Sequence, residues 1–186
     1  MVQRSVSPEA STRTRPTTPT TGLLACGVVA GPLFLGVWLI QALTRDGFDL
    51  TYHPLSLLSL GGLGWIQITS FVVAGLLNVA FAAGLRRVLH TGRGGTWGPL
   101  LIALSGVGLV MAGVFTADPG AGFPPGAPIG APTHISWHGV LHEVGFMVTS
   151  VSWIASCYVL ARRFAEFAFT MALAVRLLRA TARRLP

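Results

Sequence analysis

Two histidines and nearby acidic side chains are the residues of this sequence whose spacing could do chemistry. His138 and His142 lie four residues apart, so on a helix they share one face and could bind one metal ion. His53 could add a third imidazole and Asp118 a carboxylate, each from a loop. Nitrogen and oxygen ligands of this kind bind zinc and leave room for a water molecule. The sequence therefore offers a candidate metal site of His53, Asp118, His138 and His142, with zinc as the candidate ion.

The candidate catalytic residues are Asp118 and Glu143. Glu143 directly follows His142 and could act as a general base. Its segment, His-Glu-Val-Gly-Phe, does not match the His-Glu-x-x-His motif of zinc proteases. The histidines could instead cap helices or bond loop carbonyls, and Asp118 before Pro119 could cap a turn. The sequence favours this structural role and leaves the metal site open as an alternative.

The elements that would carry these residues are membrane-spanning helices. The chain has 186 residues, of which 52% are hydrophobic and only 10% charged, and its mean hydropathy is +0.65. Soluble domains carry roughly a quarter of charged residues, so this chain lacks the surface of a soluble protein. Its positive charge comes entirely from arginines, which sit in short groups between apolar runs. We therefore expect a lipid bilayer as its environment and no binding to nucleic acid.

Four apolar runs predict an all-α fold, a polytopic transmembrane helical bundle. Each is long enough to cross a bilayer of about 30 Å, and they cover residues 22–43, 65–85, 97–116 and 137–160. The predicted domains are a disordered basic cytoplasmic tail (1–21), a transmembrane four-helix domain (22–163) and an amphipathic C-terminal segment (164–186). We expect the last segment to form an amphipathic helix or a partial fifth helix.

The two loops on the far side of the bundle from the N-terminus are not simple linkers. Residues 51–62 predict a short outer-loop helix that begins near Pro54 and stops at Gly61-Gly62. The loop from Asp118 to Ser136 contains five prolines and four glycines. A long loop of this composition could dock on the helix ends as a lid.

Small and polar residues follow one face of the predicted helices. The fourth helix has the clearest such face, with His138, His142, Gly145, Thr149, Ser152 and Ser156 at steps of four and three. Polar side chains in hydrocarbon need partners, so these faces should point into the bundle. Gly27 and Gly31 form a G-x-x-x-G pair that we expect to pack within the monomer, although a homo-oligomer or partner helices would also use it.

The arginines predict the orientation. Three precede the first run, three lie between the second and third, and Arg162 and Arg163 follow the fourth. The two remaining loops hold one arginine and three aspartates. By the positive-inside rule, we predict a multi-pass protein of the cell inner (plasma) membrane with its N-terminus in the cytoplasm. The candidate metal ligands then lie at the outer face.

Four motifs of the sequence carry a family resemblance. They are Tyr52-His53-Pro54-Leu55-Ser56-Leu57-Leu58-Ser59-Leu60-Gly61, Gly64-Trp65-Ile66-Gln67, Phe115-Thr116-Ala117-Asp118-Pro119 and Trp137-His138-Gly139-Val140-Leu141-His142. Together they resemble the bacterial integral membrane family catalogued as domain of unknown function 998. The resemblance covers residues 23–163. It implies a fold of spanning helices, usually more than four, and the region after Arg163 departs from that pattern.

Function is predicted only coarsely. The leading interpretation is a multi-pass integral membrane protein of unassigned activity, structural or binding. One alternative is a metal-dependent membrane hydrolase with an outward-facing His/Asp site. The arrangement is loosely similar to that of the membrane hydrolase superfamily that includes alkaline ceramidases. A second alternative is a small-solute transporter, which would need a continuous wet path between the polar helix faces. Whether the chain is an enzyme stays open.

Overall fold

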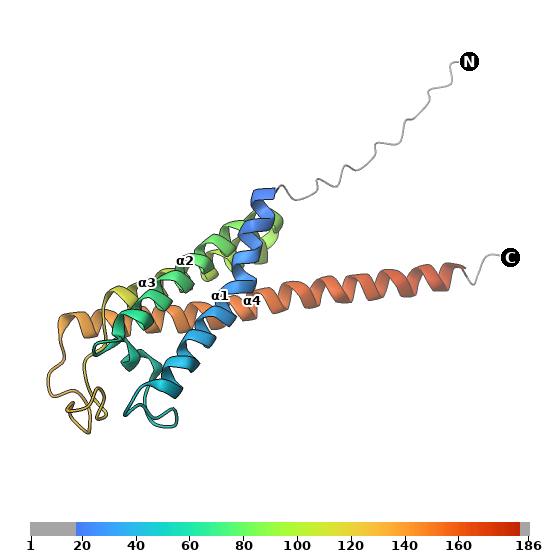
Figure 1. Cartoon of the computed structure of the whole chain (residues 1–186). Coiled ribbons are helices and arrows are strands. Elements are labelled where there is room, and N and C mark those ends of the chain that lie inside the picture. The colour runs from blue at the N-terminus through green and yellow to red at the C-terminus, as the bar shows by residue number, and fades with distance from the viewer. Residues whose placement is uncertain (1–17, 183–186) are drawn as a thin grey trace, which may run out of the picture.

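The computed structural model describes residues 18–182, which fold into a bundle of α-helices (Figure 1). The helices are α1 (Thr18–Thr44), α2 (Gly64–Val88), α3 (Gly92–Val114) and α4 (Trp137–Ala182), with a short 3-10 helix, η1 (Leu55–Ser59), between α1 and α2. No strand occurs in this part of the chain. All four α-helices are long and apolar enough to cross a membrane. The prediction of an all-α bundle with four spanning helices is therefore confirmed.

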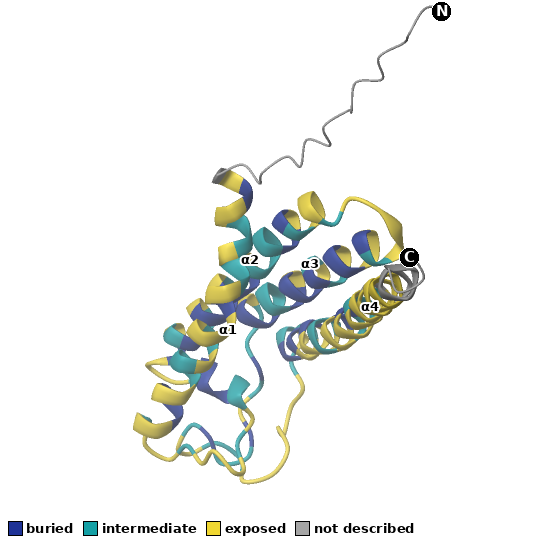
Figure 2. Cartoon of the chain, turned by 90° about the vertical axis from the view of Figure 1, so that its right-hand side faces the viewer, coloured by how far each residue is buried: buried dark blue, intermediate teal, exposed yellow. Residues whose placement is uncertain are grey.

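The helices pack in chain order through small residues. The main contacts are those of α1 with α2, α2 with α3, and α3 with α4. A Cβ atom added at Gly75 would lie 2.6 Å from the carbonyl oxygen of Gly106, and one added at Gly108 would lie 2.7 Å from that of Gly145. Only residues without a side chain allow two backbones to approach so closely. Figure 2 shows buried residues along the facing sides of these helices.

The polar helix faces point inward, as predicted. Gln67 on α2 is fully buried and accepts a hydrogen bond from the side-chain amide of Gln41 on α1 (2.7 Å). On α4, Ser152 and Ser156 are buried as well. The two glycines of the G-x-x-x-G pair on α1 have different surroundings. Gly27 packs on the ring of Phe81, whereas a Cβ atom added at Gly31 would meet no other atom within 4 Å.

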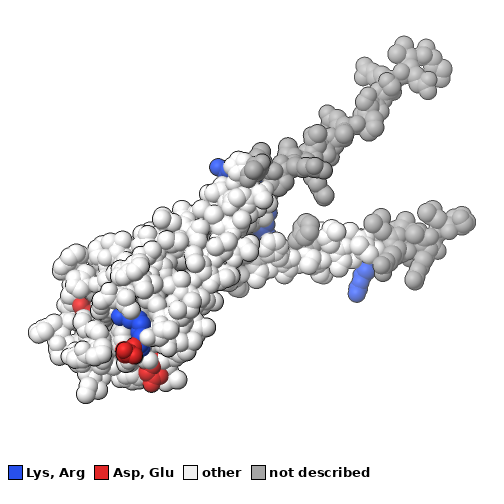
Figure 3. Space-filling model, in the orientation of Figure 1, with Lys and Arg blue, Asp and Glu red and all other residues white. Residues whose placement is uncertain are grey.

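The two ends of the bundle differ, and we name them by what they contain. The loop end consists of residues 45–63 and 115–136, and the turn end consists of the α2–α3 turn (89–91) with Arg162 and Arg163. At the loop end, Leu58 and Phe123 form the centre of a buried apolar cluster. The carboxylates visible in Figure 3 gather at this end.

Arg45 joins the two loops of the loop end. Its guanidinium donates hydrogen bonds to the carbonyl oxygens of Leu58 and Leu60 and lies 5.2 Å from the ring centroid of Phe123. The helix predicted over 51–62 is shorter than expected, because only Leu55–Ser59 is helical. The residues before it are used in a turn, in which the backbone N–H of His53 bonds the carbonyl of Asp49.

The C-terminal part of α4 differs from the prediction. Instead of ending near residue 160 and being followed by a separate segment, α4 continues without a break past Arg163 to Ala182. It projects beyond the other helices (Figure 1), and the described side chains from Phe164 to Arg176 are exposed. Two adjacent arginines do not end a helix, because arginine is a good helix former and its side chain can reach out to water.

The predicted basic tail is described only at its last residues. Residues 1–17, with the three arginines of that tail, lie outside the described part of the chain. Thr18 to Thr21 belong to the first turn of α1 rather than to a tail.

Candidate functional site

Ser136 and Asp118 hold the start of α4. Ser136 directly precedes the helix, and its hydroxyl oxygen accepts a hydrogen bond from the backbone N–H of Gly139 (3.0 Å), which is an N-cap arrangement. The Asp118 carboxylate accepts hydrogen bonds from the backbone N–H of Ser136 (2.8 Å) and from its hydroxyl (2.6 Å). A side chain at Gly139 would overlap this carboxylate. Asp118 therefore ties the end of α3 to the positive end of the α4 dipole.

These bonds also fix the charge of Asp118. The hydrogen bonds from the side chain of Ser136, and then from its backbone, hold the pKa of Asp118 below its ordinary value. Nearby His138 and His142 lower that pKa slightly, while partial desolvation opposes the change. The group is thus a carboxylate at neutral pH, and both of its oxygens already have partners.

His138 and His142 are held in one tautomer by backbone carbonyls. Nδ1 of His142 lies 2.9 Å from the carbonyl oxygens of both Ala112 and Phe115, and Nδ1 of His138 lies 3.1 Å from that of Thr116. A carbonyl can only accept, so each Nδ1 carries the proton. The lone pair of each neutral imidazole is then on Nε2. This is also how metal-binding histidines are commonly oriented.

His53 is occupied at both ring nitrogens. Its Nδ1 accepts a hydrogen bond from the backbone N–H of Asp49 (2.8 Å), so its Nε2 is the donor to the carbonyl of Ala121 (2.9 Å). The ring also packs against Phe48 and Phe123. His53 therefore connects the first loop to the second, and binding a metal would require breaking one of these two bonds.

The four predicted ligands come to the same end of the bundle but not to one point. Asp118 and His138 share Ser136 as a neighbour, and His142 follows one turn further along α4. His53 instead bonds the carbonyl of Ala121 in the second loop. Over residues 18–182, no three His, Cys, Asp or Glu side chains form a group that could hold a metal ion. Metal binding stays a prediction to which this geometry adds no support.

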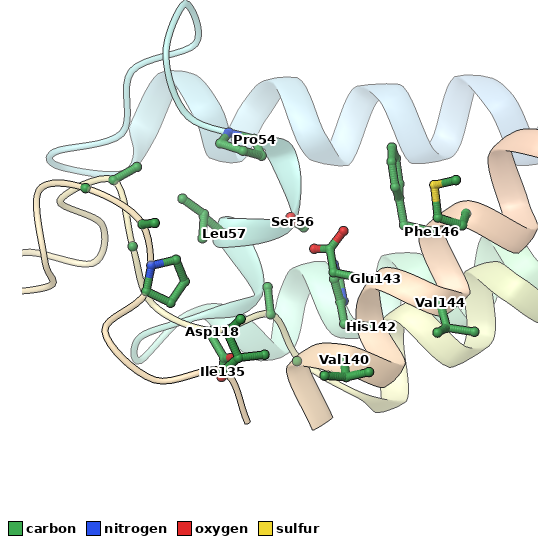
Figure 4. Close-up of a pocket in the computed structure, with 18 of the residues that line it drawn as sticks. Pro54, Ser56, Leu57, Asp118, Ile135, Val140, His142, Glu143, Val144 and Phe146 are labelled. Carbon is green, nitrogen blue, oxygen red and sulfur yellow. The ribbon is translucent and has the colours of Figure 1, made fainter. Parts of the chain in front are cut away.

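A cavity of about 1000 Å³ opens beside this cluster. It lies between the first turns of α4 and the two loops, with Leu57 of η1 and Ile135 among its apolar walls. Figure 4 shows the carboxyl group of Glu143 pointing toward the η1 segment, with His142 beside it. Phe146 and Met147, which line the cavity farther along α4, are exposed. The cavity is therefore continuous with the side of α4 that no other helix covers.

The cavity has a negative charge and no compensating cation. Its described lining includes Asp118 and Glu143 but no arginine. Glu143 has no hydrogen-bond or ion-pair partner among the residues that the structure describes. His142 is only 2% exposed, and no described residue bonds its Nε2. The cavity thus presents the exposed, unpaired carboxylate of Glu143 and the buried imidazole of His142 beside mainly apolar residues.

Sequence reasoning missed Ser136, Gly139 and Arg45. A signal existed for Ser136, because serine directly before a helical run is a common N-cap. Gly139 and Arg45 had no comparable signal, since their importance depends on contacts with residues far along the chain.

Comparison with protein families agrees with this architecture. Residues 28–182 match the family described as "Protein of unknown function (DUF998)". The chain belongs to this family. The DUF998 match includes the part of α4 after Arg163, so that region does not depart from the family pattern as the sequence resemblance implied. No curated protein and no solved structure matches the chain. Family and fold together make it a multi-pass membrane protein of unassigned activity.

Proposed function

We propose that this DUF998 protein binds an amphipathic molecule with an apolar chain and an amine head group in the cavity at the loop end. The observation that carries the proposal is the unpaired Glu143 carboxylate in the apolar wall of that cavity. Ligand sites are typically apolar clefts with a few polar groups that fix orientation. Glu143 is exposed at this cavity and has no partner of its own, so a cationic head group could pair with its charge.

Each wall of the cavity has a part in this binding. The ammonium group donates hydrogen bonds to the carboxylate of Glu143 and to Nε2 of His142, whose Nδ1 already bonds backbone carbonyls. The apolar chain lies along Phe146 and Met147, toward the hydrocarbon. Asp118 adds negative potential but is held by Ser136, so it is a positioning residue for α4.

The proposal includes an orientation, with the N-terminus in the cytoplasm and the loop end outside the plasma membrane. The distribution of arginines supports it. Single cysteines can test it in a background in which Cys26 and Cys157 are replaced by serine. Cysteines at Asp46 and Ile129, which is 85% exposed, should react with an impermeant thiol reagent in intact cells. Labelling of a cysteine at Arg87 instead would mean that the orientation is inverted.

The two alternative functions have no observation in their favour. A metal-dependent hydrolase needs converging ligands, and the imidazole of His53 is occupied at both nitrogens. A transporter needs a continuous polar path, but Gly108 of α3 and Gly145 of α4 bring these two helices too close for a channel between them.

Binding can be tested with three photoreactive probes that share one dodecyl chain and end in an amine, an alcohol or a carboxylate. In nanodiscs of neutral lipid, the amine should label the α4 peptide most strongly. Glu143→Gln should weaken binding of the amine at least about tenfold, because it replaces a charge-assisted hydrogen bond between two ions by one to a neutral amide oxygen. Glu166→Gln is the matched control, because Glu166 is on the same helix far from the cavity. Equal labelling by all three probes, or an equal loss in both variants, would contradict the proposal.

A further inference from the structure

A second cavity lies at the turn end and has the opposite charge. Its volume is about 970 Å³, and it is bounded by the α2–α3 turn, the first turn of α3 and the middle of α4. We call it the arginine cavity, because Arg93, Arg162 and Arg163 line it. The described lining contains one acidic residue, Glu166. Three guanidinium groups and one carboxylate leave two positive charges in excess.

The start of α3 and the residue before it, Thr91, hold Arg163 in position. Its Nη1 donates a hydrogen bond to the carbonyl of Thr91 (2.6 Å). Cβ atoms at Gly94 and Gly95 would each lie 2.9 Å from atoms of the Arg163 side chain. The two glycines therefore let this side chain lie flat against the start of α3. One cation is thus held in place at the edge of the cavity.

The other two arginines are available to a ligand. Arg162 donates one hydrogen bond, from Nη1 to the hydroxyl of Tyr158 (3.1 Å), which leaves most of its five donors unused. Arg93 has no hydrogen-bond or ion-pair partner among the described residues. No ion pair joins any of the three to a carboxylate in the described part of the chain, although the charge of Glu166 acts on Arg162. Guanidinium groups in such a state suit a doubly or singly charged oxyanion, which they can bind through two parallel hydrogen bonds.

We propose that the arginine cavity binds a phosphate group, supplied by the head group of an anionic phospholipid. Leu89, Val159 and Phe164 line the same cavity and offer an apolar surface to the acyl chains. The cavity lies where two candidate spans end and begin, Val88 of α2 and Gly92 of α3, which is the depth of lipid head groups. Basic pockets between transmembrane helices recognise anionic head groups in this way.

Native mass spectrometry of the full chain in non-ionic detergent can count bound lipids without an anionic surface. We expect one phosphatidylglycerol to bind in preference to phosphatidylcholine. Arg93→Gln should weaken that binding about fivefold, and Arg93→Gln with Arg162→Gln should weaken it about 25-fold, from the usual contribution of one arginine near an anionic lipid. Arg93→Gln makes no change to a protein contact, so folding should be retained, as checked by the thermal midpoint.

Arg87→Gln is the matched control. Arg87 is exposed at the end of α2 near the same end of the bundle, but it does not line the cavity, so its loss should leave phosphatidylglycerol binding unchanged. An equal loss in the Arg87 and Arg93 variants, or no preference for phosphatidylglycerol, would overturn the proposal. If inorganic phosphate at millimolar concentration displaces phosphatidylglycerol, the cavity is still a phosphate site, but its ligand is free phosphate rather than a lipid head group. No competition would leave the lipid as the source.

Discussion

The loop end and the turn end use their charged residues in different ways. At the loop end, Arg45, His53 and Asp118 each bond a segment of chain far away in sequence, so these groups hold the fold together. At the turn end, Arg163 also bonds a distant segment, through the carbonyl of Thr91, whereas Arg93 in the adjoining first turn of α3 has no described partner and Arg162 bonds only Tyr158. The difference teaches that a charged residue near a membrane surface is informative about ligands only when the protein itself does not satisfy it.

The same criterion separates residues within the loop end. Glu143 is one turn of α4 away from His138, yet only His138 bonds the protein backbone. From the sequence, His138 is a candidate metal ligand and Glu143 a candidate general base. Their hydrogen bonds show that the unpaired carboxylate is the group free to meet a ligand.

Arg45→Met should have the largest effect on stability, and it tests directly whether the charged residues of the loop end stabilise the fold. It removes two charge-assisted hydrogen bonds and the contact with the ring of Phe123, and we expect a loss of about 3 kcal/mol in unfolding free energy. Arg93→Met is the matched change at the turn end and should alter stability by less than about 0.5 kcal/mol. Urea unfolding in detergent measures both. Similar losses of unfolding free energy in the two variants would mean that the charged residues of the two ends contribute equally to stability.

Gly139→Ala should be the next largest change. The new methyl group overlaps the Asp118 carboxylate, which must leave the start of α4 and its bonds with Ser136. We expect a cost of about 1–3 kcal/mol. Gly130→Ala adds a methyl group where nothing lies within 4 Å and should be close to neutral. Hydrogen exchange at residues 118–139 should rise only in the first variant, and unchanged exchange there would mean that Asp118 does not anchor α4.

Acid should loosen the loop end through Asp118. Because its pKa is lowered in the folded chain, its contribution to stability is complete above the ordinary aspartate pKa of about 3.9 and is lost as the pH falls through the lowered value. Asp49 also has a lowered pKa, chiefly from hydrogen bonds with Thr51. Thermal midpoints between pH 2.5 and 6 should therefore fall less steeply in Asp118→Asn than in the unchanged chain. Parallel curves would contradict the sign of this linkage.

Deleting the chain from Met171 onward should have the smallest effect on the bundle. The described side chains beyond that residue are exposed, and the main contacts of α4 are with α3. We expect the thermal midpoint to change by no more than about 1–2 °C, since none of the described side chains from Met171 to Arg176 is buried. A large drop, measured by fluorescence-detected size exclusion after heating, would mean that this segment supports the bundle.

The sequence was sufficient to predict the spanning helices, because apolar runs as long as residues 65–85 are not stable in water and can cross a bilayer only as helices. It was insufficient to predict where α4 ends. Arg162 and Arg163 suggested the end of the helix, but both are part of it. Within the site, topology correctly brought Asp118, His138 and His142 to one end. The occupation of both nitrogens of His53 could not be predicted, since it depends on how two loops meet.

The packing of each helix mainly on its neighbour in the chain has a consequence for biosynthesis. The order in which the ribosome delivers α1, α2, α3 and α4 is also the order in which each finds its partner in the bilayer. Contacts between neighbours in sequence form quickly, because they close only short stretches of chain. The bond between Asp118 and Ser136 forms late in this order of events, when α4 starts to enter the membrane. The cavity at the loop end therefore exists only in chains whose last helix has been inserted.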